Sequence, residues 1–307
     1  MDLVVRCRRA PVPGETIRGD DLATFPGGKG ANQAVAAARL GAQVHMIGRV
    51  GNDPFGRAMR TSLTTSGVNI RFVRTSESHA TGTATILVRD GGENSIIISP
   101  GANADVAPRD IDAAIDVIRK ADFVLLQLEI PVATVRYAIQ LCRRLGVRTM
   151  LDPAPAPGKF PRALYRVDLL TPNETEAMTI LKLPERLDAQ STMNRLLAAG
   201  AKQVALKLGS RGSMLGTSAE LISAPGFKVK VVDSTAAGDC FNAALAVGLA
   251  EGMTQNDALR FANAAGALAC TKSGAQTSLP NRSAVKQFLK KGRRMAIRRL
   301  WGVNNKS

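Results

Sequence analysis

One stretch decides the fold of this chain: Val232-Asp233-Ser234-Thr235-Ala236-Ala237-Gly238-Asp239-Cys240-Phe241-Asn242. It follows a β-rich run, Phe227 to Val232, and precedes an apolar, alanine-rich segment, Phe241 to Glu251, so it predicts a strand, a turn of small residues and a helix. Unpaired N–H groups at such a helix start carry partial positive charge and suit a phosphate. Asp239, beside that phosphate, is placed to take a proton from an attacking hydroxyl. Taken alone, the turn is better explained by an aspartate that only caps the helix, so the rest of the chain has to decide.

The composition is that of a globular protein. Of 307 residues, 45% are hydrophobic and 4% aromatic, so Ala, Val, Leu and Ile must build the core. The four cysteines lie far apart without a C-x-x-C pair, which indicates reduced thiols and argues against a zinc site. No apolar run reaches transmembrane length, and the N-terminus lacks a signal-peptide core. We therefore expect a cytoplasmic protein with no membrane partner.

The net charge of +16 is concentrated at the C-terminus, because Lys286 to Ser307 holds eight Lys or Arg and no acid. Such a block can bind nucleic acid or acidic surfaces. It can equally be the solvated face of a last helix, Ala284 to Leu300. No nucleic-acid-binding signature accompanies it, so we interpret residues 284–307 as a basic C-terminal helix and tail, without a nucleic-acid partner.

Helical and strand patterns alternate along the chain. A helix is expected at 31–40, a strand at 44–47, a possible short strand at 22–25, and a hairpin of 84–88 with 95–99 around Asp90-Gly91-Gly92. From Pro108 onward a helix to Lys120, a strand at 123–127, a helix at 131–145 and a strand at 148–151 follow. This alternation predicts one α/β domain over 1–307, with a central, mostly parallel sheet flanked by helices. Glu129 falls just past a strand end, where open α/β sheets place ligands.

Four motifs are similar to those of the PfkB-type carbohydrate kinases. Asp233 to Asp239 resembles the C-terminal signature of that family, and Gly27-Gly28-Lys29-Gly30-Ala31-Asn32-Gln33-Ala34 resembles its N-terminal signature. Both signatures, together with Thr171 to Glu176 and Leu208 to Gly212, resemble the ribokinase-like members in particular, and the likeness runs from Met1 to about Pro280. It implies a ribokinase-like fold whose small β-sheet lid, from segments of about 3–26 and 68–100, covers the sugar and pairs two subunits in a homodimer. The residues alone also allow an ordinary edge hairpin.

The resemblance implies ATP-dependent phosphorylation of D-ribose at the 5-hydroxyl. Asp239 would be the catalytic base, and the turn of Ala236, Ala237 and Gly238 would be the anion hole for the transferred phosphoryl group. Together with Asp239, the sugar ligands would be Asp2, Gly28, Lys29, Gly30, Ala31, Asn32 and Glu129. The alternatives are a kinase for deoxyribose, another sugar or a nucleoside, or a truncated, catalytically weak protein that binds a sugar or a nucleotide.

For the nucleotide, the resemblance implies contacts of ATP with Asn173, Lys207, Leu208, Gly209, Ser210, Arg211, Gly212, Gly238, Asp239 and Asn263. Magnesium would be held through water near Asn173 and Glu176. Potassium would be held largely by carbonyl oxygens at Asp233, Thr235, Ala269, Lys272, Gly274 and Ser278, which suits a hard cation. From the residues alone, Asn173 with Glu176 predicts a helix capping box, and residues 209–212 predict a turn.

Two further expectations concern single residues. Family members complete a core strand and a Gly-Ser-x-Asn segment before the aspartate that matches Asp2, so the resemblance predicts that this first strand is missing before Met1, through a late start assignment or a truncation. Asp2 would then be poorly held at a frayed terminus. Cys240 follows the base at a helix start, where the dipole favours a thiolate, yet a small buried hydrophobe is the interpretation that we favour.

Overall fold

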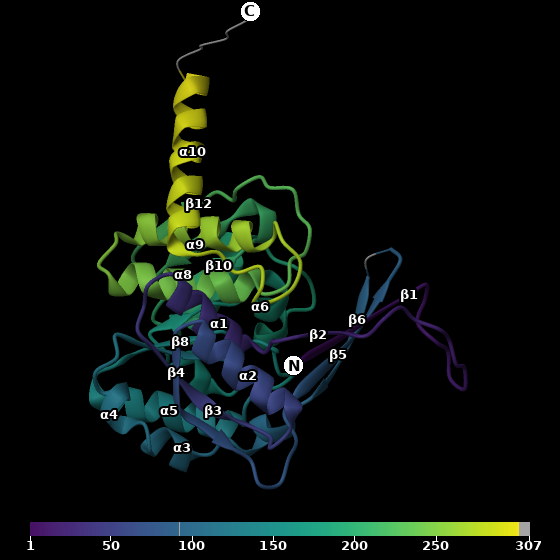
Figure 1. Cartoon of the computed structure of the whole chain (residues 1–307). Coiled ribbons are helices and arrows are strands. Elements are labelled where there is room, and N and C mark those ends of the chain that lie inside the picture. The colour runs from purple at the N-terminus through teal and green to yellow at the C-terminus, as the bar shows by residue number, and fades with distance from the viewer. Residues whose placement is uncertain (92, 301–307) are drawn as a thin grey trace, which may run out of the picture.

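The structure, a computed structural model, describes residues 1–91 and 93–300, with side chains described as far as residue 291. The last seven residues of the predicted basic tail, 301–307, therefore lie outside the described residues. The body is a central sheet between two layers of helices, from which a small sheet projects to one side and a long helix projects to another (Figure 1).

The central sheet has six strands in the spatial order β12-β11-β10-β9-β8-β7. β7 to β10 run parallel, while β11 and β12 are antiparallel additions at one edge. The strands are β7 (Phe123–Leu126), β8 (Arg148–Leu151), β9 (Leu169–Leu170), β10 (Val204–Lys207), β11 (Ser213–Gly216) and β12 (Leu221–Ala224). This arrangement confirms the predicted α/β class with its mostly parallel sheet.

Alternate residues of the strands build two separate cores, because neighbouring side chains in a strand point to opposite faces. Met150 packs into the core beneath one helical layer and Leu151 into the core beneath the other. The first layer contains α1 (Lys29–Arg39), α8 (Ala237–Ala250) and α9 (Gln255–Ala269). The second contains α3 (Pro108–Asp112), α4 (Ile115–Ile118), α5 (Val132–Leu145), α6 (Glu174–Leu181) and α7 (Ala189–Ala198).

A second parallel pair, β3 (Val44–Val50) with β4 (Val68–Thr75), is connected by α2 (Pro54–Thr65) and shares the first core. Within the part of the chain that the structure describes, no strand pairs with the outer edge of β3 or of β7. Residues 68–75, which sequence reasoning assigned to the lid, are thus part of the body. The later segment of the lid begins at residue 83.

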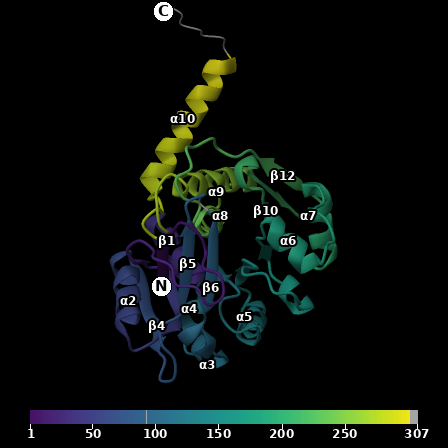
Figure 2. The same cartoon turned by 90° about the vertical axis from the view of Figure 1, so that its right-hand side faces the viewer.

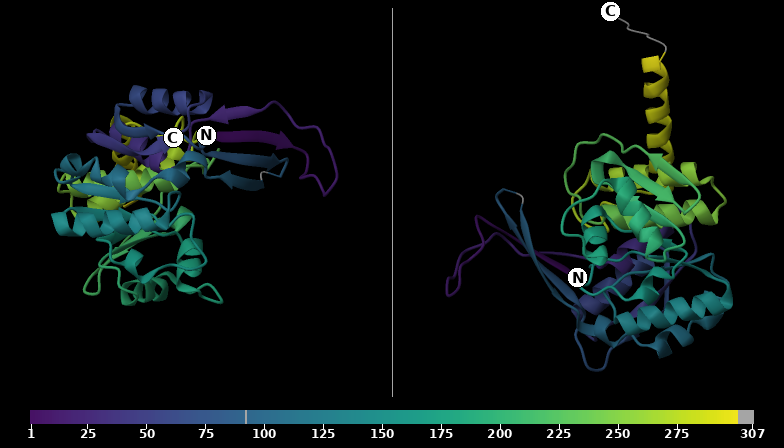
Figure 3. Two further views of the ribbon diagram at one scale, coloured as in Figure 1. Left: turned by 90° about the horizontal axis from the view of Figure 1, so that it is seen from below. Right: turned by 180° about the vertical axis from the view of Figure 1, so that it is seen from behind.

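The projecting lid is a four-stranded sheet in the order β2-β1-β5-β6 (Figure 3). Its strands are β1 (Asp2–Cys7), β2 (Ala23–Phe25), β5 (Thr83–Arg89) and β6 (Asn94–Ser99). Asp2 pairs with Phe25 on one side and with Ala84 on the other, so it is held within a sheet rather than at a frayed end. The expectation that Asp2 is poorly held is therefore wrong.

Two expected elements differ from the structure. Residues 227–232 form no strand, although their alternation of Lys with Val is typical of one. Val231 and Val232 are 62% and 58% exposed, so this segment lacks the buried face that would favour pairing. The helix expected from Pro108 to Lys120 is divided into α3 and α4.

The C-terminal helix α10 (Arg282–Leu300) leaves the body and extends well beyond it (Figure 2). Its start is anchored by Val285, which is buried in the first core. Among the described residues, no helix combines the length and the apolar character needed to cross a membrane.

Candidate active site

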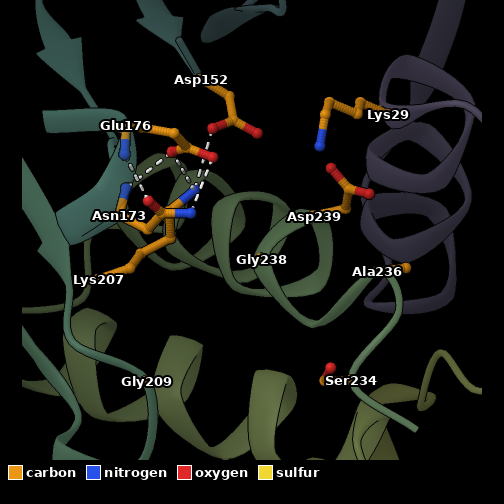
Figure 4. A pocket seen from close by; sticks show the side chains of 10 residues that line it. All are labelled: Lys29, Asp152, Asn173, Glu176, Lys207, Gly209, Ser234, Ala236, Gly238 and Asp239. Carbon is orange, nitrogen blue, oxygen red and sulfur yellow. Dashed lines mark hydrogen bonds and ion pairs between the residues drawn. The ribbon is translucent and has the colours of Figure 1, made fainter. Parts of the chain in front are cut away.

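The candidate site lies where the C-terminal ends of the parallel strands meet the N-terminal ends of α1 and α8. Open α/β sheets place ligands at such an edge, since loops and helix starts converge there. A cavity of about 400 Å³ opens at this point (Figure 4). It is lined by Lys29, Asp152, Asn173, Glu176, Lys207, Gly209, Ser234, Ala236, Gly238 and Asp239.

The floor of the cavity is the turn into α8. Ala236 has φ 60° and ψ 8°, the left-handed region that an alanine adopts at some cost, and it reverses the chain before the helix. The Ala237 N–H donates to the Ser234 carbonyl at 3.2 Å and closes the turn. A Cβ atom on Gly238 would lie 3.6 Å from the Lys207 ammonium, so a cation and a helix N-terminus face the same point. An anion such as a phosphoryl group is stabilised in this position.

Asp239, in the first turn of α8, is 5% exposed and is held by two amides from α1. Its Oδ2 accepts from Asn32 Nδ2 at 2.9 Å, and its Oδ1 accepts from Gln33 Nε2 at 3.1 Å. Burial raises the pKa of Asp239 to about 6, with Lys29 opposing the rise and Asp152 adding to it. A carboxylate with this pKa is ionised near neutral pH and is a better proton acceptor than an exposed aspartate.

Lys29 and its neighbours form the other wall. The Lys29 side chain points toward the Asp239 carboxylate on the same side of the cavity (Figure 4). Burial opposes the charge of its ammonium, but the surrounding carboxylates, Asp239 foremost, outweigh burial and raise the pKa of Lys29. The backbone N–H of Lys29 donates to Glu129 Oε2 at 2.8 Å, and burial raises the pKa of Glu129.

Glycines bring Asp2 to the same wall. A Cβ atom on Gly27 would lie 2.2 Å from the Asp2 carboxylate, so only glycine allows this approach. Gly28 has φ 87°, and a Cβ atom on it would lie 3.7 Å from Glu129 Oε2. Asp2, Gly28, Lys29, Asn32 and Glu129 are thus brought together as sequence reasoning predicted, while Gly30 and Ala31 lie in the first turn of α1 beside them.

The opposite wall is built from strand ends and the start of α6. Lys207 Nζ donates to Asp152 Oδ1 at 3.0 Å and lies 3.9 Å from Glu176 Oε2. Asn173 and Glu176 form the predicted capping box, with Glu176 N donating to Asn173 Oδ1 and Asn173 N donating to Glu176 Oε2, both at 2.7 Å. Both residues also line the cavity, so their capping role does not remove them from it.

Other predicted nucleotide residues are more dispersed. Leu208 precedes the short 3-10 turn of Gly209, Ser210 and Arg211, which ends at Gly212, and of these only Gly209 lines the described cavity. Arg211 forms an ion pair with Glu174 at the start of α6. Asn263 is 8% exposed and its amide is occupied, donating to the Ala224 carbonyl at 3.0 Å and accepting from Ser213 Oγ at 2.8 Å. In this structure Asn263 ties α9 to β11 and β12.

The predicted potassium residues are partly assembled. Asp233 Oδ1 accepts from Thr235 N at 2.9 Å, and its Oδ2 accepts from Gly274 N at 2.9 Å, so the segment before the turn is tied to the loop after α9. The backbone N–H of Val232 also donates a hydrogen bond of 2.8 Å to the Cys270 carbonyl. Ala269 ends α9, Lys272 is exposed, and Ser278 is buried with its hydroxyl donating to the Ala275 carbonyl. The Asp233 carboxylate supplies the hard oxygens that suit an alkali cation.

Sequence reasoning missed the role of Gln33 and Asp152. Gln33 stands in the quoted N-terminal motif, and Asp152 ends a strand at the ligand edge, so a signal existed for both. Neither was assigned a contact, because 119 positions separate them in the chain. The structure joins them by a hydrogen bond of 3.1 Å between Gln33 Nε2 and Asp152 Oδ2.

Cys240 is fully buried, and its burial raises the pKa of the thiol far above its ordinary value. The helix dipole does not produce a thiolate here, because desolvation and the adjacent Asp239 carboxylate both oppose the negative charge. The interpretation of Cys240 as a small buried hydrophobe is the one that this geometry supports.

Comparisons with known proteins agree with this geometry. The sequence profile described as pfkB family carbohydrate kinase matches residues 1–282. Ribokinase of Bacillus subtilis is 41% identical over 289 residues, which cover 94% of this chain and 96% of that protein. Ribokinase of Schizosaccharomyces pombe is 40% identical over 297 residues, with 91% of this chain and 92% of that protein covered.

Solved structures give the same result. The structure of Arabidopsis thaliana ribokinase complexed with ribose and ATP is similar with a TM-score of 0.87 at 36% identity, covering 94% of this chain and 95% of that one. Ribokinase from Thermotoga maritima is similar with a TM-score of 0.86 at 38% identity, covering 94% of this chain and 96% of that one.

Proposed function

The chain belongs to the pfkB family of carbohydrate kinases, and we propose that it transfers the γ-phosphoryl group of ATP to the 5-hydroxyl of D-ribose. It is a phosphotransferase that acts on an alcohol group. One observation carries the assignment: the buried carboxylate of Asp239 stands in the first turn of a helix whose N-terminus and Lys207 face an anion position. Relatives named ribokinase match nearly the whole chain, which favours ribose as the acceptor.

In the proposed reaction, Asp239 accepts the proton of the sugar hydroxyl as the oxygen attacks the γ-phosphorus. Asn32 and Gln33 hold the carboxylate, so its orientation needs no rearrangement during transfer. The negative charge that develops on the phosphoryl oxygens is stabilised by the start of α8, with the Gly238 N–H as donor, and by Lys29 and Lys207. ADP leaves with the bond from the γ-phosphorus to the β-γ bridging oxygen broken.

The remaining sugar hydroxyls are matched by the wall beside Lys29. Asp2 and Glu129 supply acceptors, and the Gly27–Gly28 turn lets a ligand approach the backbone closely. Asp2 belongs to β1, so a sugar that binds it also contacts the lid sheet. We assign these residues to ribose recognition.

Two cations complete the proposal. Glu176, whose carboxylate faces the cavity, is suited with Asn173 to hold magnesium through water, and the bound ion would neutralise charge on the β- and γ-phosphates. Asp233, Thr235, Ala269, Lys272, Gly274 and Ser278 are assigned to a potassium ion that stiffens the turn before α8. The proposed homodimer forms through the lid, where β6 exposes Ile96, Ile97 and Ile98 at 52%, 67% and 52%. The cytoplasmic location stays a prediction.

The experiment is an ADP-release assay across a panel of ribose, deoxyribose, other sugars and nucleosides, with magnesium and potassium present. We expect ribose to give the highest kcat/KM, and ³¹P NMR of the product to show a phosphate on the 5-carbon. A higher kcat/KM for a nucleoside would move the assignment to a nucleoside kinase. ATP and ribose binding without turnover would support the alternative, a catalytically weak binding protein.

A further inference from the structure

Gln33 is not among the residues that line the cavity, but its side chain forms hydrogen bonds with carboxylates from both walls of the cavity. Its side chain is buried, with 2% of the residue exposed. Its Nε2 donates to Asp239 Oδ1 and to Asp152 Oδ2, both at 3.1 Å, and its Oε1 accepts from Gln127 Nε2 at 2.5 Å. Both amide hydrogens are therefore used between two nearly buried carboxylates, and the oxygen fixes which way the amide faces.

The contacts continue to the nucleotide wall. The second oxygen of Asp152 accepts from Lys207 at 3.0 Å, and Lys207 stands beside Gly238 and within 3.9 Å of Glu176. Asp152 is 2% exposed, so this ion pair is shielded from water. An unbroken series of hydrogen bonds thus joins Asp239 to the cation at the phosphoryl position.

We propose that Gln33 is a positioning residue for phosphoryl transfer: its amide orients the Asp239 carboxylate and ties it, through Asp152, to Lys207 on the nucleotide side. The inference rests on the proposed function, because it takes Asp239 as the base. Without the amide, two carboxylates would face each other with no donor between them. A base held by Asn32 alone spends less time aimed at the hydroxyl, which lowers kcat and leaves ground-state binding almost unchanged.

A purely structural role for Gln33 predicts a different result. If the amide only helped α1 to pack, a side chain of equal length without polar atoms would change stability and leave the ionisation of Asp239 alone. The charged groups around Asp239 are Lys29 on α1 and Asp152 after β8, with the Cys240 thiol next along α8 and Glu129 beyond Lys29. The rate falls at acidic pH as Asp239 becomes protonated, so the acidic limb of the pH–rate profile reports on the ionisation of Asp239.

The test compares Gln33→Met and Asp152→Asn with wild type. Gln33→Met should lower kcat about 10- to 100-fold, the usual effect of removing a hydrogen bond to a charged group, with KM for ribose and MgATP within about threefold. Its acidic limb should move to higher pH, because a donor to the ionised form is lost. Asp152→Asn should move the limb to lower pH, because a neighbouring negative charge is removed.

Gln203→Met is the matched control, because Gln203 directly precedes β10, at the end of the strand opposite Lys207, and its amide donates to the Gln255 side chain. This variant should leave kcat and the pH profile at wild-type values. Titration of the Asp239 carboxyl carbon by ¹³C NMR in wild type and Gln33→Met gives a readout that needs no turnover. If wild type fails to phosphorylate ribose, the proposed function fails, while a higher Asp239 pKa in Gln33→Met still supports the contact.

A Gln33→Met protein with wild-type kcat and an unmoved Asp239 titration would overturn the inference. If Gln33→Met does not fold, Asp152→Asn decides: a limb that moves to lower pH supports the connected carboxylates, and an unmoved limb contradicts them.

Discussion

Replacing Asp239 by asparagine should abolish phosphoryl transfer and stabilise the protein at the same time. Asp239 is 5% exposed, and burial raises its pKa from 3.8 to about 6. Ionising this carboxylate therefore costs more in the folded protein than in the unfolded chain. The difference between 3.8 and about 6 corresponds to about 3 kcal/mol, since each tenfold change in an equilibrium constant is worth about 1.4 kcal/mol.

The pH window follows from proton linkage. The folded pKa lies above the unfolded one, so the folded protein binds the extra proton between pH 3.8 and about 6. The destabilisation is absent below this window, grows through it and is complete above it. The Asn side chain would point one N–H group at the amide donor of Asn32 or of Gln33. This contact between two donors offsets about 1 kcal/mol of the gain. A net gain of about 2 kcal/mol should raise Tm by about 4 °C at pH 8 and by less at pH 4.5.

The assay pairs thermal unfolding without ligands at pH 8 and pH 4.5 with the ADP-release measurement. Turnover of Asp239→Asn should fall by about 10²- to 10⁴-fold, the usual contribution of a general base. Asp110→Asn is the control of opposite sign: Asp110 is 1% exposed, and although burial opposes its charge, Arg49 at 3.0 Å holds its pKa below the ordinary value. Loss of this partner should destabilise the protein at pH 8 by roughly 3–5 kcal/mol.

The reasoning is refuted if Asp239→Asn melts at or below the wild-type temperature at pH 8. It is also refuted if the gain in Tm is the same at both pH values, because the gain would then have no connection with ionisation. Turnover within a few-fold of wild type would remove Asp239 from the role of base.

Three further predictions concern the cations and the lid. Replacing sodium by potassium at fixed magnesium should raise kcat in the ADP-release assay, and equal rates in the two salts would remove the ion from the proposal. Lys207→Met should raise KM for MgATP about tenfold or more, since Lys207 faces the phosphoryl position, and an unchanged KM would contradict that placement. Ile97→Glu should convert the proposed dimer to a monomer in size-exclusion chromatography with light scattering, whereas Val12→Glu, also exposed but outside the strands of the lid sheet, should leave that dimer intact.

Sequence reasoning succeeded where the information is local. The turn before Asp239, the glycines before Lys29 and the capping box at Asn173 each specify a helix start within a few residues, and the structure has α8, α1 and α6 at these places. The alternation of strands and helices also predicted the edge of the sheet at which the candidate site lies, because parallel strands bring their C-terminal ends together. Local signals therefore located most of the candidate site.

It failed where the outcome depends on distant partners. Val68 to Thr75 has the composition of a lid strand, yet it pairs with β3 in the body. Residues 227–232 have the alternation of a strand, yet within the described part of the chain they belong to no sheet. Pairing is decided by tertiary structure, and propensity alone does not contain it.

The connection between Gln33 and Asp152 shows the same limit at the level of chemistry. Nothing about a glutamine in a helix or an aspartate at a strand end marks the two as neighbours, and only the packing of α1 over the sheet brings them within 3.1 Å. Once they are joined, the charges of the cavity can be understood together. Three carboxylates, Asp152, Glu176 and Asp239, face two ammonium groups, those of Lys29 and Lys207. These carboxylates raise the pKa of Lys29 against the effect of burial, and Asp152 adds to the rise that burial causes in the pKa of Asp239. The excess of negative charge would also repel a bare nucleotide. A polyphosphate that arrives with a divalent cation carries less negative charge and meets less repulsion, so the carboxylates of the cavity favour MgATP over free ATP.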